Sequence, residues 1–160
     1  MGPVFRRCRE LGYSMGAGRM NTLIRIDGWR ARFDAACDAM RRKPFAWGDH
    51  DCLVGLVGDS VEALTGADIV SPWRDRYTSG IGALRVLRND GFADLGDLVA
   101  TILPEIHISR ARLGDIAAIP SDDGFGSALG VVNGERILVL RPEGFGTVDL
   151  LSATRAFRVG

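Results

Sequence analysis

The stretch PFAWGDHDCLVGLVGDSVEALTG, Pro44 to Gly66, decides how this chain is interpreted. It begins with an aromatic-glycine turn, passes through three polar residues to a single cysteine, Cys52, and ends in an apolar run closed by glycine. The spacing of the leucines and valines after Cys52 predicts a helix that begins at this cysteine. Asp51 is the predicted N-cap and Gly66 the predicted C-terminal stop. Cys52 is then either a nucleophile or a small buried residue.

Outside this stretch, helical patterns come first and strand patterns follow. Further helices are predicted over residues 27–42, 81–89 and 95–103, the first of them capped by Asp27. Strands are predicted in GDIAAIP, SALGVV, ERILVL, TVDLL and AFRV, with Asn133-Gly134 as a hairpin turn between the second and third. Helices followed by an antiparallel sheet make an α+β domain. Gly55 and Gly58 lower helix propensity, so they predict close packing against another element.

Composition restricts the class of protein. The chain has 160 residues, 46% of them hydrophobic, with 20 acidic and 20 basic side chains, so a strongly basic nucleic-acid-binding surface is not expected. No apolar run is long enough to span a bilayer. Residues 1–19 are interpreted as a flexible lead-in without an apolar signal-peptide core, with Met20 as a candidate natural start. Residues 20–160 are expected to form a single domain.

Cysteine and histidine are few. Cys8, Cys37 and Cys52 are too widely spaced for a disulfide framework or a CxxC zinc site, and His50 and His107 do not complete one. No metal or other cofactor is therefore expected. Cys37 is expected to lie in the core, and the chain to be made in a cytoplasm with reduced thiols.

A cysteine in the first turn of a helix is a chemically favoured nucleophile. The free N–H groups and the helix dipole there lower the thiol pKa, whereas Asp49 and Asp51 oppose that effect by like-charge repulsion. A nucleophilic cysteine also needs a base, usually histidine. His50 is a weak candidate because it precedes the N-cap, and His107 lies in the link between helices and sheet.

The motif FAWGDHDCLVGLV resembles the catalytic-cysteine motif of NlpC-type cell-wall peptidases, which have a papain-like fold. GDIAAI, Gly114 to Ile119, resembles the Gly-Asp strand of that family, and ALGVVNGERILVL resembles its histidine strand and hairpin. The resemblance implies N-terminal helices packed on a C-terminal antiparallel sheet, Cys52 as nucleophile, and a cleft that includes Trp47 and Asp51. The chain more closely resembles phage and prophage proteins of this type, whose genes commonly lie beside tail-assembly genes.

The resemblance does not extend to the base. It places Ala128 at the histidine position, and the third polar position falls at Leu138 to Leu140, which is apolar. General-base help is worth about 10²–10⁴ in rate, so the expected protein is a catalytically degenerate pseudoenzyme. Period-two alternation predicts that Ala128 faces the Cys52 sulfur from its strand.

Three functions remain open at this point. The first is a virion protein of the phage or gene-transfer-agent tail tip or baseplate, made in the host cytoplasm, with other tail proteins and peptidoglycan as partners. The second is an active cysteine peptidase or amidase that hydrolyses peptidoglycan stem peptides through Cys52. The third is a sugar- or peptide-binding module that uses the cleft without cutting.

Overall fold

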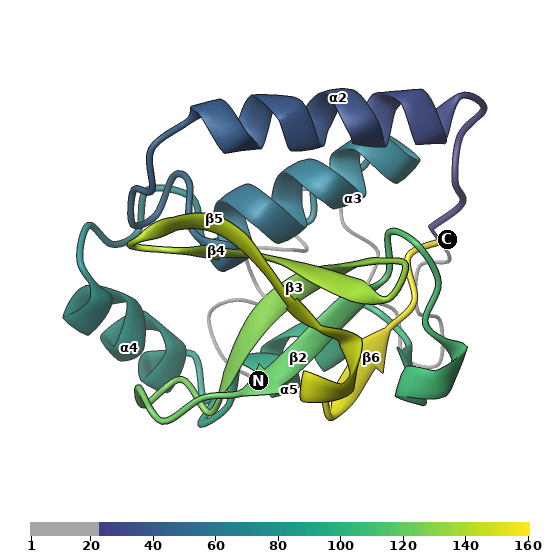
Figure 1. Ribbon diagram of the computed structural model, residues 1–160. Coiled ribbons are helices and arrows are strands. Elements are labelled where there is room, and N and C mark those ends of the chain that lie inside the picture. Colours follow the sequence, from purple (N-terminus) through teal and green to yellow (C-terminus); the bar gives the residue numbers. More distant parts are fainter. Residues whose placement is uncertain (1–22) are drawn as a thin grey trace.

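The computed structural model describes residues 23–160, so the predictions for residues 1–19, Met20 and Cys8 lie outside the described part of the chain. The fold is α+β: helices cover an antiparallel six-stranded sheet, in the strand order β1-β6-β2-β3-β4-β5 (Figure 1). The strands are β1 (Glu105–Ile106), β2 (Ile116–Pro120), β3 (Ser127–Asn133), β4 (Arg136–Arg141), β5 (Gly144–Asp149) and β6 (Arg155–Phe157). The helix-then-sheet order predicted from the sequence is therefore confirmed at this level.

The helices fall into two groups around the sheet. α2 and α3 lie side by side at the top of the view, and α4 lies at the lower left (Figure 1). The helical segments are α2 (Trp29–Arg42), the π-helix η1 (Cys52–Val57) that runs into α3 (Gly58–Thr65), α4 (Gly80–Asn89) and α5 (Leu95–Ala100), with short 3₁₀ turns η2 (Ile108–Arg110) and η3 (Leu150–Ser152). None of the helices in the described residues is long and apolar enough to cross a membrane.

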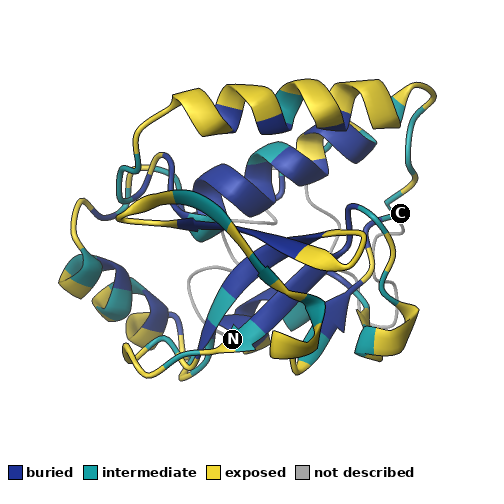
Figure 2. Cartoon of the chain, viewed as in Figure 1, coloured by how far each residue is buried: buried dark blue, intermediate teal, exposed yellow. Residues whose placement is uncertain are grey.

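Each face of the sheet buries a separate apolar cluster. The larger cluster joins the helices to one face and includes Leu56, Leu64, Leu129, Val131 and Phe157. The smaller cluster covers the other face and is centred on Ala117, Val132, Ile137, Val139 and Ala153. Figure 2 shows the result: α3 and the middle of the sheet are buried, whereas the outer face of α2 is exposed. The alternation of strand residues between the two clusters follows the period of two.

The helix that begins at Cys52 starts as a π-helix, which the sequence pattern did not predict. The N–H of Leu56 bonds the carbonyl oxygen of Asp51 at 2.9 Å, an i→i+5 bond. Gly55 and Gly58 permit this packing, as predicted from their low helix propensity. A Cβ on Gly55 would lie 2.8 Å from the Cα of His50, and one on Gly58 would collide with Val70.

Three boundaries also differ from those predicted. Asp27 does not cap the first helix; Gly28 is its N-cap, with φ 74° and no side-chain hydrogen bond, so Asp27 lies one residue too early. The α-helix predicted over 95–103 ends at Ala100, and turn hydrogen bonds carry the chain to residue 103. β1, which pairs with β6, was not predicted because two residues carry no alternating pattern.

The hairpin between β3 and β4 turns one residue later than predicted. Asn133 pairs with Arg136, so the two loop residues are Gly134 and Glu135 rather than Asn133 and Gly134. Gly134 has φ 70°, a conformation in which glycine is unstrained at the first position of a two-residue hairpin loop.

Candidate active-site pocket

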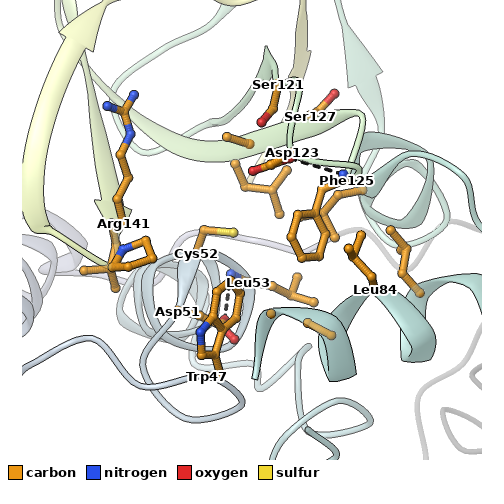
Figure 3. A pocket seen from close by; sticks show the side chains of 18 of the residues that line it. Trp47, Asp51, Cys52, Leu53, Leu84, Ser121, Asp123, Phe125, Ser127 and Arg141 are labelled. Carbon is orange, nitrogen blue, oxygen red and sulfur yellow. Dashed lines mark hydrogen bonds between the residues drawn. The ribbon is translucent and has the colours of Figure 1, made fainter. Parts of the chain in front are cut away.

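Cys52 lies half-buried at the start of η1 and opens into a pocket of about 600 Å³. The walls come from the turn before η1 and the start of η1, the segment from residue 73 to α4, α5, the adjoining ends of β2 and β3 with the loop between them, and the end of β4. Figure 3 shows Trp47, Leu84, Phe125 and Asp123 gathered around the thiol. The lining is predominantly apolar, which is typical of pockets that bind small organic molecules or side chains.

Asp51 fixes the start of η1 and is fully engaged in doing so. Its carboxylate accepts hydrogen bonds from the N–H groups of Leu53 at 3.1 Å and Val54 at 2.8 Å, which makes it the N-cap that the sequence predicts. It also accepts from the N–H of Gly48 at 2.9 Å and from the hydroxyl of Tyr77 at 2.6 Å. Asp51 lines the pocket but is only 2% exposed, and its hydrogen bonds join three segments of the chain at this point.

The aromatic-glycine turn before Asp51 forms one wall of the pocket. Gly48 has φ 78°, and a Cβ there would collide with the backbone oxygen of Tyr77, so glycine is required for both conformation and space. Trp47 stacks on Phe125 with ring centroids 6.1 Å apart and meets the edge of Phe45 at 4.9 Å. The sequence predicts Trp47 as a cleft residue, and the structure places it there.

The surroundings of Cys52 keep the thiol protonated. Burial, together with the negative charges of Asp51 and Asp123, raises its pKa to about 12, although a hydrogen bond from the backbone N–H of Leu129 acts in the opposite direction. The advantage of a helix N-terminus is reduced because Asp51 already accepts from the first free N–H groups. At neutral pH the group that faces the pocket is therefore a neutral thiol.

His50 lies outside the pocket and faces the other side of η1. The side chain is fully buried, and its Nε2 lies 3.1 Å from the carbonyl oxygen of Met40. A carbonyl can only accept, so Nε2 carries the proton, and Nδ1 has no hydrogen-bond partner in the described residues. A Cβ on Gly55 would lie 2.7 Å from this Nδ1, which places the ring against the η1 backbone. This geometry offers no path for proton transfer to the Cys52 thiol.

The second histidine is also remote from the thiol. His107 lies exposed between β1 and η2, where its Nδ1 lies 2.7 Å from the hydroxyl of Ser109. No histidine lines the pocket in the part of the chain that the structure describes. Nor do residues 23–160 contain a group of three or more His, Cys, Asp or Glu side chains that could hold a metal ion.

Ala128 and Cys52 both line the pocket, but Ala128 does not lie on the face of β3 that packs with the helices. Leu129 and Val131 pack with the helices, so alternation places Ala128 with Val132 on the other face of the strand. The group of β3 that reaches the sulfur is the backbone N–H of Leu129. As predicted, Ala128 and Val132 lie on one face of β3 and Leu129 and Val131 on the other. The face that carries Ala128 is not the one packed on η1.

The pocket also includes residues that the sequence did not single out as site residues. Four of them are Trp73, Tyr77, Asp123 and Phe125. Trp73 and Tyr77 belong to a loop rich in aromatic residues and arginine, which was a usable signal of a buried or binding segment. Asp123 and Phe125 lie in a glycine-rich loop whose sequence gives no sign that it closes over Cys52.

Comparison with known proteins places the chain in one family. Residues 24–159 match a family described as a domain of unknown function, DUF6950, and the chain therefore belongs to that family. Neither the curated proteins nor the solved structures contain a significant match.

Proposed function

For this member of the DUF6950 family, we propose that the pocket beside Cys52 is a binding cleft that does not hydrolyse its ligand. The sequence resemblance to NlpC-type phage proteins extends this proposal to a role at the tail tip, where such a cleft would contact peptidoglycan or neighbouring tail proteins. The fold class is compatible with that resemblance, and the resemblance alone supports the location in the virion.

The environment of the thiol carries the proposal. Burial and the nearby carboxylates raise the pKa of Cys52 to about 12, so the thiol is protonated at neutral pH. Within residues 23–160 no histidine lines the pocket to take the proton, and the carboxylate nearest in sequence, Asp51, is held by four hydrogen bonds. An acyl-transfer reaction needs an activated nucleophile, and these surroundings suppress activation.

The test is hydrolysis of purified cell-wall sacculi. We expect the wild-type protein to release no more stem peptide than the Cys52→Ala variant over a wide range of protein concentrations. Binding of the protein to sacculi, measured by sedimentation, should be the same for both. Turnover by the wild type that disappears in Cys52→Ala would contradict the proposal.

One observation favours the alternative, an active cysteine peptidase or amidase. Cys52 opens directly into the pocket, and the N–H of Leu129 points at its sulfur, where it could also stabilise developing negative charge. This enzyme would need a base from a partner chain. Hydrolysis that appears only when purified tail proteins are added, and that requires Cys52, would establish it in place of the binding role.

A further inference from the structure

The pocket carries negative charge that no ion pair neutralises. Neither Asp51 beneath it nor Asp123 at its mouth makes a salt bridge within residues 23–160. The bonds to Asp51 come from backbone N–H groups and a tyrosine hydroxyl, and Asp123 accepts a hydrogen bond from the N–H of Phe125 at 3.2 Å. Asp51 is buried, so its charge is weakly screened, and Asp123 adds an exposed carboxylate at the mouth; both favour positively charged ligands.

Among residues 23–160, Arg141 is the one basic side chain that lines the pocket, and it is directed elsewhere. Arg141 at the end of β4 extends away from Cys52, whereas Asp123 lies on the thiol side of the opening (Figure 3). Glu143 lines the same rim and adds a further negative charge. A cation in the pocket would therefore meet carboxylates without competition from a built-in guanidinium.

The aromatic wall next to Asp123 adds a second preference for cations. Phe125 and Trp47 lie nearly parallel, at an angle of 18°, and both border the opening. The faces of aromatic rings attract ammonium groups by cation–π interaction. Below them the lining is hydrocarbon, including Leu84, Leu87 and Leu140, and leaves about 600 Å³ of space. A ligand that satisfies both parts has an ammonium group and an aliphatic or aromatic body.

We propose that the pocket binds an amphiphilic cation, a primary or quaternary amine on an apolar body, with its charge beside Asp123 and Phe125 and its body against the leucines. This inference rests on the proposed binding role of the pocket and names its ligand class. Asp51 takes no direct part, because its oxygens are already occupied by four hydrogen bonds. Its negative charge attracts the cation at a distance.

The test compares three probes of equal chain length: octylamine, octanol and octanoate, each below its micelle concentration. Affinities are measured by NMR titration of the full-length protein, following the indole N–H signals of Trp47 and Trp73. We expect octylamine to bind about fivefold tighter than octanol and octanoate to bind most weakly, since partly exposed ion pairs and cation–π contacts each contribute modestly.

Two variants test whether Asp123, at the mouth of the pocket, is the source of the preference for the amine. Asp123→Asn should remove most of the preference for octylamine over octanol and leave the octanol affinity within about twofold. Asp122→Asn is the matched control, because Asp122 is the exposed neighbour that does not line the pocket. Circular dichroism verifies that both variants are folded.

Several results would overturn the inference. These are equal binding of the three probes, tightest binding of octanoate, loss of the amine preference in Asp122→Asn, or no response of the pocket tryptophans to any probe. Cys52-dependent hydrolysis of sacculi would instead contradict the proposed function, whichever probe binds best. The two failures can therefore be told apart.

Discussion

Cys37 and Cys52 each lie in a helical segment with an aspartate next to them in sequence, but the surroundings of the two aspartates differ. Cys37 lies on the packed face of α2 and is followed by Asp38, whereas Cys52 begins η1 and is preceded by Asp51. Both are free thiols, and burial is the main reason why the pKa of each is raised, to about 11 for Cys37 and about 12 for Cys52.

The neighbouring aspartates add unequally to this effect of burial. The Asp38 side chain is 62% exposed and pairs with Arg41 at 3.3 Å, so solvent and a counter-charge weaken its effect on the nearby thiol. Asp51 is 2% exposed and has no counter-charge among the described residues. A cysteine at a helix start is therefore not activated by position alone, because a buried aspartate cap uses the N–H groups that would stabilise its thiolate.

The largest loss of stability is expected from removing Asp51, with Asp38 as the comparison. Asp51→Ala should lower the free energy of unfolding by about 3 kcal/mol, because four buried donors lose a charged acceptor. Asp38→Ala should change it by less than about 0.5 kcal/mol, since an exposed ion pair contributes little. Urea denaturation measures both, and similar losses in the two variants would remove the proposed contrast.

A smaller difference is expected from the glycines of the two helices. Gly55→Ala should cost about 2 kcal/mol, because the added Cβ would overlap His50 and the surroundings must shift. Gly28→Ala, at the N-cap of α2, meets open space and should cost about 1 kcal/mol through its φ of 74° alone. Thermal and urea unfolding check the order; a larger loss at Gly28 would show that η1 is less closely packed than described.

The smallest effect concerns stability at high pH. The pKa of Cys52 rises from 9.0 to about 12 on folding. The stabilisation of the folded state that results is fully present below pH 9 and is lost as the pH rises toward 12. At pH 10 the loss is about 1 kcal/mol, and Cys52→Ala should remove that part of the decline. Cys37→Ala should behave alike at pH 10, because the pKa of Cys37 also lies above it.

That prediction is checked by urea unfolding at pH 7 and pH 10 for all three proteins. Part of the decline should remain in both variants, because burial and the charge of Asp51 also raise the pKa of Tyr77. An unchanged pH dependence in Cys52→Ala would show that the thiol ionises equally in the folded and unfolded chain.

Local signals in the sequence predicted local structure well. Asp51 caps η1, and Gly66 ends α3 in the left-handed conformation, each as predicted. The π-helical start was not predictable, because it arises where Gly55 packs on His50. The hairpin loop moved by one residue, because strand pairing continues through Asn133.

The pocket was only partly predictable, because its walls meet through the tertiary fold. Trp47, Asp51 and Cys52 lie in one motif and were identified together. Phe125 and Asp123 reach the thiol from a loop more than seventy residues later, at the end of β2, and no local pattern indicates such contacts. The sequence alone could therefore predict a cysteine at a helix start, but not the negative, aromatic opening around it.

The most direct test of the non-hydrolytic role is the pH dependence of Cys52 alkylation. Iodoacetamide labelling of a Cys8→Ser protein, resolved by peptide mass spectrometry, reports Cys52 and Cys37 separately in one sample. The rate at Cys52 should still be rising at about pH 10, and Asp51→Asn should move its curve to lower pH, because removing a negative charge favours the thiolate. Asp38→Asn should leave the Cys37 curve nearly unchanged. Half-maximal labelling of Cys52 below about pH 8 would reveal an activated thiolate and contradict the binding role.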